Sequence, residues 1–308
     1  MKKLLLAASV LTLAACNGET TAPAAIAPHL DRLSATIPLA GATIAYNHIP
    51  NPLPPNYPSL GYQATQTAEF GDLVTLSGTA RRAGSVTVAM SDWAKHSDYP
   101  AMGASGFSHP ITVNIYASNS GALGNLLGTV TQTFTIPWRP EADLTCPGGT
   151  AWRASDTNCY NGFAFTIKLD FTSVPLTLPN DIIVGIAYNT NTWGYSPIGQ
   201  SGPYESLNVG VVDGSPSAGT DVNPDAVFWN TMTAANYTDG GFGGVGTFRS
   251  DTNWSGYAPA FSVTTFLPVP TDANQCKKDG YLSYSRIDGT TFTNQGECTS
   301  YLNAKKGK

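Results

Sequence analysis

Charged residues are scarce in this chain of 308 residues, and lysine is scarcest in its middle part. Asp, Glu, Lys and Arg together make up 12% of the sequence, about half of their usual share. Between positions 43 and 270 the only lysines are Lys95 and Lys168. Exposed helix faces usually draw on Lys, Glu, Leu and Ala. The composition therefore disfavours helices and suits strands joined by tight turns.

A surplus of positive charge is also missing. The formal net charge is -5 at pH 7, and it becomes about -7 (-5 minus 2) if Lys2 and Lys3 are removed with a leader. Nucleic acid is bound by basic surfaces that neutralise phosphates, so no nucleic-acid partner is expected. Polybasic attachment to anionic lipid is disfavoured for the same reason.

Long hydrophobic runs are absent, because no apolar stretch reaches the roughly 20 residues that a membrane-spanning helix needs. The apolar stretch at the N-terminus, 4–13, follows two lysines and leads into Ala14, Ala15 and Cys16. A charged start, a short apolar stretch and small residues before a cut are the parts of a secretory signal. The sequence therefore predicts an exported protein with no membrane-spanning segment.

The same segment resembles a bacterial lipoprotein signal. The resemblance implies that Cys16 is the lipidated first residue of the mature chain, held at a membrane by more than one acyl chain. Asn17 stands where an aspartate would favour inner-membrane retention, which implies the outer membrane or the cell surface. The alternative is a secreted protein cut near Ala15 that keeps an odd cysteine.

Cysteine is rare, and an even number remains when Cys16 is set aside. Four cysteines in an oxidising compartment predict two disulfides. Three pairings are possible, and the two local ones are favoured because turn residues flank them: Cys146 with Cys159, and Cys276 with Cys298. No Cys-x-x-Cys occurs and no histidine lies near these pairs, so we assign no metal site and no cofactor.

Apolar residues alternate with polar ones in many short segments. Strands are predicted at 73–76, 84–91, 111–116, 127–136, 163–171, 181–188, 207–212, 246–249 and 260–266. The segment 181–188 is nearly all apolar, which indicates a strand buried on both faces. Together the pattern predicts an all-β fold, an antiparallel β-sandwich of jelly-roll-like type. The Gly- and Asn-rich stretch 214–244 is interpreted as one long loop.

Four parts follow from these patterns: a signal peptide (1–15), a lipidated flexible tether (16–40), the β-sandwich (41–270) and a disulfide-closed C-terminal segment (271–308). The proline-rich stretch 47–58 is predicted to be an extended lead-in on the surface or along a sheet edge. In the last part, Asn294 and Glu297 form a helix start before 298–304. A hairpin is predicted around Asp288 and Gly289.

Five segments are distinctive when taken together: 61–72 (GYQATQTAEFGD), 90–93 (MSDW), 109–112 (HPIT), 131–140 (TQTFTIPWRP) and 185–190 (GIAYNT). In combination they resemble a family of bacterial secreted proteins of unassigned function, over roughly 57–266. The resemblance implies one domain and life outside the cell. It supplies no catalytic residues.

A polar and aromatic loop follows the most apolar strand. It contains the candidate ligand-binding residues Asn189, Asn191, Trp193 and Tyr195. Aromatic rings could stack on a sugar face while the amides bind its hydroxyls. The alternative is a loop folded over the sandwich end, with Trp193 as its plug.

Other polar residues carry weaker hypotheses. Glu69, Asp72 and Asp92 are candidate carboxylates for a glycosidase, which needs two of them on either side of a bond, although 69–72 is also typical of a turn. His96 and His109 could act as bases, yet no nucleophile-elbow or His-Glu-x-x-His motif accompanies them.

The long loop region holds five aspartates that could offer oxygen ligands to calcium: Asp213, Asp221, Asp225, Asp239 and Asp251. Their spacing matches neither an EF-hand nor a glycine-aspartate repeat, and ordinary turn residues are the simpler interpretation. The run 240–244 lacks the following Lys-Ser/Thr of a phosphate loop.

Three functional hypotheses remain. The favoured one is a non-catalytic, surface-anchored protein that binds an extracellular ligand such as a glycan, or makes envelope contacts. The second is a secreted hydrolase of polysaccharide, and the third is a purely structural envelope component. The expected partners are a membrane, through the lipid, and a carbohydrate or other surface ligand. No catalytic residue is assigned.

Overall fold

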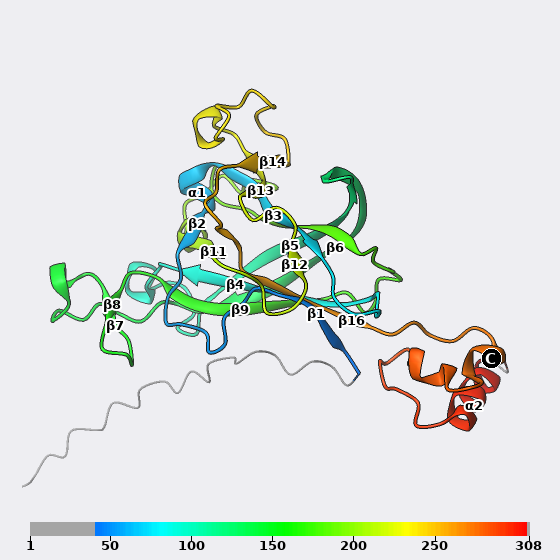
Figure 1. Cartoon of the computed structure of the whole chain (residues 1–308). Helices are drawn as coiled ribbons and strands as arrows, with labels where there is room; N and C mark the ends of the chain where they lie inside the picture. Colours follow the sequence, from blue (N-terminus) through cyan, green and yellow to red (C-terminus); the bar gives the residue numbers. More distant parts are fainter. Residues whose placement is uncertain (1–40, 307–308) are drawn as a thin grey trace, which may run out of the picture. The chain divides into compact units, whose positions relative to one another are not determined.

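The computed structural model describes residues 41–306 of the chain (Figure 1). Up to Phe266 this range is built mainly from antiparallel strands in two stacked seven-stranded sheets, so the predicted β-sandwich is confirmed. Cys16 and the predicted signal and tether, 1–40, lie outside the described residues. Within 41–306, no helix has the length and apolarity needed to cross a bilayer.

The first sheet has the order β1-β16-β4-β11-β15, with β9 paired to β4 and β2 paired to β11. Its strands are β1 (Thr43–Asn47), β2 (Ser59–Gly61), β4 (Arg82–Asp92), β9 (Phe163–Asp170), β11 (Leu207–Val212), β15 (Ala258–Pro259) and β16 (Phe261–Phe266).

The second sheet has the order β14-β13-β3-β10-β5-β6, with β12 paired to β3. Its strands are β3 (Thr67–Thr75), β5 (Phe107–Asn119), β6 (Ala122–Ile136), β10 (Asp181–Tyr188), β12 (Thr220–Asp221), β13 (Ala226–Thr231) and β14 (Arg249–Thr252). The chain passes back and forth between the two sheets, in a jelly-roll-like manner.

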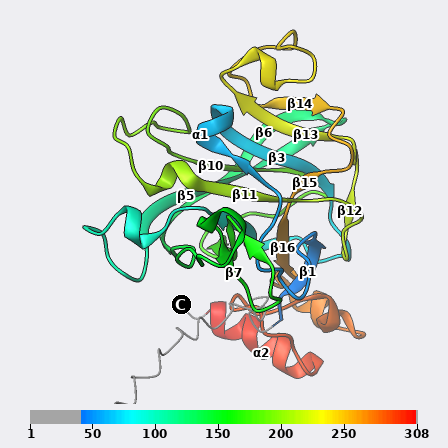
Figure 2. The same cartoon turned by 90° about the vertical axis from the view of Figure 1, so that its left-hand side faces the viewer.

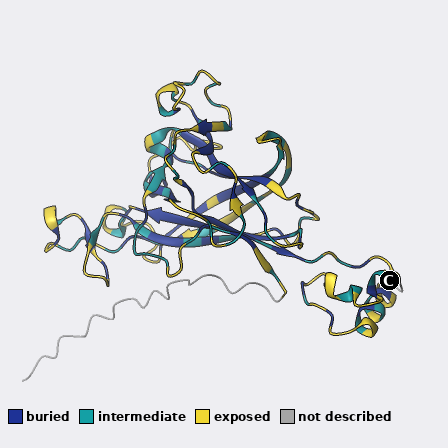
Figure 3. Ribbon diagram, in the orientation of Figure 1, coloured by how far each residue is buried: buried dark blue, intermediate teal, exposed yellow. Residues whose placement is uncertain are grey.

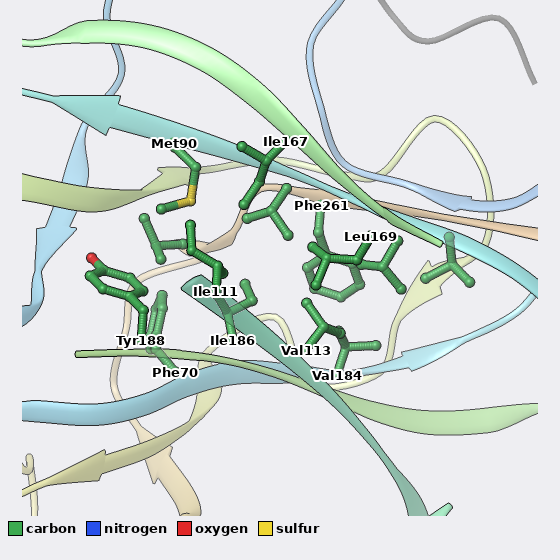
Figure 4. Close-up of a cluster of buried hydrophobic side chains, with 14 of the residues drawn as sticks. Phe70, Met90, Ile111, Val113, Ile167, Leu169, Val184, Ile186, Tyr188 and Phe261 are labelled. Carbon is green, nitrogen blue, oxygen red and sulfur yellow. The ribbon is translucent and has the colours of Figure 1, made fainter. Parts of the chain in front are cut away.

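The main core lies between the sheets (Figure 4). Met90 and Ile167 of the first sheet meet Ile111 and Ile186 of the second, as the period-2 patterns predict. Each such side chain contributes about 1.5–3 kcal/mol when it is fully buried. Buried residues follow most of the strands, with β6 the main exception, and exposed ones gather in the connections (Figure 3). β10 is buried on both faces, as expected from its sequence.

Three predictions about the strands are wrong. The strand predicted at 246–249 lies farther along the chain, because β14 spans Arg249–Thr252. The stretch 214–244 is not one loop, because it contains β12 and β13, and β13 lies between β3 and β14 in the second sheet. Its adjacent Phe228 and Trp229 point to opposite faces and are both buried, so no alternation marks the strand. β3 begins at Thr67 instead of 73, which places 69–72 inside a strand and not in a turn.

Short helical elements complete the described range. They are α1 (Tyr62–Thr65), η1 (His96–Asp98), η2 (Pro147–Gly149), η3 (Pro203–Ser206), η4 (Ala234–Asn236), η5 (Ala273–Cys276), η6 (Gly280–Ser283) and α2 (Gln295–Lys306). A small two-stranded sheet is formed by β7 (Trp152–Arg153) and β8 (Cys159–Tyr160).

Both favoured disulfides are present, Cys146–Cys159 and Cys276–Cys298. The second joins η5 to α2, and its two cysteines are buried with Phe292 and Leu302. α2 begins at Gln295, directly after the predicted cap Asn294, whose side-chain oxygen accepts from the Glu297 amide at 2.9 Å. The predicted hairpin is a tight turn closed by a bridge between Ser285 and Thr291.

The proline-rich lead-in covers the outer face of the first sheet. The Pro55 carbonyl accepts from the Ala164 amide at 2.9 Å, and Pro58 accepts from Val211 at 2.8 Å. Tyr57 packs on Ala164 and on neighbouring small residues of that face. This face is therefore occupied by the chain's own segment.

Candidate ligand-binding face

Glu69 lies on the outer face of the second sheet. Phe70 and Val74 of β3 point into the core between the sheets, so alternation turns Glu69 and Leu73 to the opposite side. Leu73 accordingly belongs to a separate apolar cluster outside the main core. The acidic side chain is only 6% exposed.

The strand register places polar and small residues side by side across this face. One row runs Phe228, Gly71, Gly185, Asn114 and Thr129. The next row begins with Asn230 opposite Glu69 and ends with Thr112 opposite Thr131. The sheet centre thus combines two glycines with a carboxylate, amides and hydroxyls.

The Glu69 side chain fills the space above the glycines. A Cβ atom added at Gly185 would lie 2.1 Å from Glu69 Oε1, so the carboxylate leans across this position. Asn114 Nδ2 donates to Oε1 at 2.9 Å, and the Tyr116 hydroxyl donates to the same oxygen at 3.0 Å. Burial raises the pKa of Glu69, and these two hydrogen bonds lower it. The carboxylate is therefore fixed by neutral donors.

A buried acceptor without a hydrogen-bond partner lies beside this carboxylate, and threonine hydroxyls lie farther along the sheet. Asn230 Oδ1 is buried beside it with no hydrogen-bond partner. At the edge of the sheet, β6 presents exposed residues on the same face: Thr129, Thr131, Thr133 and Thr135. A buried acceptor without a donor costs on the order of 1–3 kcal/mol, so a ligand hydroxyl at Asn230 would be stabilising.

The second sheet curls around its outer face. β14 contacts β6 although they lie at opposite edges of the strand order (Figure 2). Leu73, Ile183, Phe228 and Phe248 pack together on this side, with Tyr116 at their border. The concave outer face is therefore apolar at one end and polar around Glu69.

The loop after β10 borders this face. Asn189 continues the outward positions of β10, and its Oδ1 accepts from the Ser196 amide at 2.6 Å. The Thr190 amide donates to the Trp193 carbonyl at 2.7 Å, which closes the turn. Tyr195 is 66% exposed. Burial and Glu69 are the larger causes of the raised pKa of Tyr116, and Tyr195 also raises it electrostatically, as a neighbour of Tyr116 would.

The four residues of the predicted loop site do not all reach this face. Asn189 and Tyr195 adjoin it. Asn191 accepts from the Gly199 amide through its backbone at 2.8 Å. Trp193 is partly exposed and does not plug the core between the sheets.

The three candidate carboxylates do not converge. Asp72, three residues after Glu69, points to the opposite face of β3. Asp92 lies in β4 of the other sheet, where burial raises its pKa to about 8 against the lowering effects of two backbone amides and Arg139. The pair of facing carboxylates that a glycosidase needs is not formed by Glu69, Asp72 and Asp92.

The candidate histidines have structural partners. His109 stacks on Tyr204 at 5.4 Å, and its Nε2 bonds the Asn189 carbonyl at 2.9 Å. Burial lowers the pKa of His109. His96 Nε2 lies 3.1 Å from the Met102 carbonyl.

Three of the candidate calcium ligands also have local roles. Asp239 pairs with Arg249 at 2.7 Å, Asp251 accepts from the Thr238 amide at 2.9 Å, and Asp225 accepts from Ser255 at 2.8 Å. Among residues 41–306, no group of three or more His, Cys, Asp or Glu side chains is placed to hold a metal ion.

Sequence reasoning missed Asn114, Tyr116 and Asn230. Asn114 is a polar residue in the middle of a strongly alternating strand, and this outward position was the available signal. Asn230 could not be placed because the sequence predicts a loop where β13 lies. No family model matches the chain, and no curated protein or solved structure matches it.

Proposed function

We propose that this protein is an exported lipoprotein that binds a hydroxyl-rich ligand, most simply a glycan, on the concave outer face of its second sheet. The observation that carries the proposal is the buried, unpartnered Asn230 Oδ1 beside the fixed Glu69 carboxylate. A ligand hydroxyl would donate to Asn230 and remove the cost of the unpaired acceptor.

The neighbouring groups suit the same ligand class. The β6 threonine hydroxyls both donate and accept, as sugar hydroxyls do. Tyr195 presents an exposed ring at the border of the face, where it could stack on a sugar ring. The two disulfides and the lipoprotein-like signal support a place outside the cytoplasm, with the membrane as partner through Cys16.

Binding without catalysis is the version favoured by the geometry. Glu69 acts on this face as a held acceptor, and Asp72 points away from it. Incubation of the purified mature chain with soluble polysaccharides should therefore release no reducing sugar. Sustained release would favour a hydrolase instead.

The binding proposal is tested with an array of immobilised glycans and three forms of the mature chain. Wild type should bind a defined subset, and Tyr195→Ala should weaken that binding by about tenfold, equivalent to 1.4 kcal/mol. Phe242→Ala, which removes a 97% exposed ring from another loop, should bind like wild type. Absence of any binding, or equal binding by Tyr195→Ala, would contradict the proposal.

A further inference from the structure

A strap of chain after β11 joins the two sheets at their side. The Asn47 amide of β1 donates to Ala218 at 2.9 Å, and the Ser217 amide donates back to Asn47 at 2.8 Å. Two residues later, β12 pairs with β3 of the other sheet. Gly219 between them has φ 72°, and a Cβ there would lie 2.7 Å from the Thr75 carbonyl, so only glycine fits.

Three side-chain oxygens at this junction are buried and have no hydrogen-bond partner: Asp72 Oδ2, Asp221 Oδ2 and Asn223 Oδ1. The other oxygen of each carboxylate is engaged. Asp72 Oδ1 accepts from the Leu73 amide at 2.8 Å, and Asp221 Oδ1 accepts from the Asn223 amide at 3.0 Å. Each aspartate therefore offers one free oxygen in an orientation that its backbone bond fixes.

The register brings these residues together. Asp221 pairs with Val74, and the Val222 amide bonds Leu73, which places Asn223 opposite Asp72. Val222 is exposed, so Asp221 and Asn223 turn inward with Asp72. Directly opposed Cβ atoms lie about 4.5–5.5 Å apart and diagonal ones about 7–8 Å. These spacings suit side chains that converge on one ion.

The charges at the junction are not balanced by a base. Asp72 is fully buried. Its pKa is raised mainly by burial and, to a lesser extent, by the negative charge of Asp221. His48 lowers the pKa of Asp221 electrostatically, while burial lowers the pKa of His48 itself. Its Nε2 bonds the Gly214 carbonyl at 3.0 Å, so Nδ1 accepts from Tyr46, whose hydroxyl is 3.4 Å away. Exposed Asp213 adds negative charge near His48.

We propose that Asp72, Asp221 and Asn223 bind a hard divalent cation, Ca²⁺, which ties the strap to β3. Oxygen-only ligands select Ca²⁺ or Mg²⁺ over zinc and copper. Ca²⁺ accepts six to eight oxygens in irregular arrangements, with waters or carbonyls completing the set, whereas Mg²⁺ demands a near-ideal octahedron. The third ligand is the side-chain oxygen Oδ1 of Asn223.

Calcium titration of the EDTA-treated mature chain tests this inference. At pH 7, calorimetry should show one Ca²⁺ per chain, and Tm should rise with CaCl₂ at about 5 mM, above the affinity range of extracellular modules. MgCl₂ should give a smaller rise. Asp221→Asn should weaken Ca²⁺ binding by about tenfold or more, whereas Asp213→Asn, in the same strap but exposed, should bind like wild type.

A second variant keeps the test decisive if Asp221→Asn does not fold. Asn223→Asp adds a carboxylate, so it should bind Ca²⁺ more tightly and be less stable than wild type in EDTA. The competing explanation is a proton shared by Asp72 and Asp221. Stability that rises on acidification and ignores CaCl₂, or a Ca²⁺ response unchanged in Asp221→Asn, would overturn the inference.

Discussion

The Glu69 side chain can take its observed position only because residue 185 is a glycine. The carboxylate occupies the space where any larger residue would place its Cβ atom. Gly185→Ala should therefore push Glu69 away from Asn114 and lower the free energy of unfolding by about 1–3 kcal/mol, as overpacking does. Urea unfolding measures this change.

The matched control is Gly103→Ala. A Cβ at Gly103 would meet its nearest atom at 3.5 Å, an ordinary contact, and the residue is exposed. This variant should stay within about 0.5 kcal/mol of wild type. Equal stability of the two variants would show that Glu69 does not rest on Gly185.

Asp92 gives the stability a pH dependence. Its pKa is about 8 in the folded chain and has its ordinary value of 3.8 in the unfolded chain. The folded state alone holds the proton between these values, so this group's contribution is full at low pH and is lost as the pH rises toward 8. The loss amounts to at most about 1.4 kcal/mol per pH unit.

Asp92→Asn removes this titration. The variant should gain stability over wild type as the pH is raised from about 4 to about 9, measured by urea unfolding at each pH. Asp170→Asn, which changes an exposed aspartate, should show no such trend. A difference between Asp92→Asn and wild type that does not vary with pH would refute the assignment.

At the scale of the elements, alternation decided what the sequence could predict. β4, β9 and β16 each turn an alternating set of apolar residues to the core between the sheets, as the period of two predicts. β13 is buried on both faces, so its sequence does not alternate, and it stands among Gly-, Asn- and Asp-rich segments that are typical of loops. The sequence therefore does not predict this strand. For this reason the sequence does not predict that Asn230 lies opposite Glu69 in the polar row.

Sequence patterns located Tyr195 and Asn189 near the site, because a polar loop after a buried strand is visible in the chain. They did not separate Glu69 from Asp72. Which face each takes depends on whether 69–72 is strand or turn, and the long-range pairing of β3 with β10 and β13 settles that.

The Cys276–Cys298 bridge should stabilise its own segment and not the sandwich. It closes a loop with a sequence separation of 22 residues around a small apolar cluster. Replacing both cysteines with serine should cost this segment about 3 kcal/mol. The resulting local unfolding should let trypsin cut the backbone after Lys277 and Lys278, whose side chains are already exposed. Limited proteolysis with mass spectrometry detects the cuts.

The same change at Cys146 and Cys159 serves as control, because this disulfide lies elsewhere in the chain and its loss should leave the backbone around Lys277 and Lys278 folded. Arg82 donates to the carbonyls of Leu267 and Ile287 at 3.3 and 2.8 Å, so some anchorage of the segment remains in either variant. Loss of the main unfolding transition in the Cys276 and Cys298 variant would contradict a local role.

At the scale of the whole molecule, the two outer faces of the sandwich differ. The lead-in covers one, and the other carries the polar row that we assign to ligand. We propose membrane attachment through Cys16, which lies outside the described residues. Cys16→Ala should abolish acylation and release the protein from membranes, measured by detergent phase partition. Membrane retention of this variant would show another means of attachment.

The concave face as the ligand site is the central claim, and amide hydrogen exchange tests it most directly. With a glycan from the array bound, exchange should slow in the β6 threonine stretch 129–135 and in the loop 189–195. It should stay unchanged in the lead-in 48–58 on the opposite side. Slowed exchange in 48–58, with none in 129–135 and 189–195, would contradict the account.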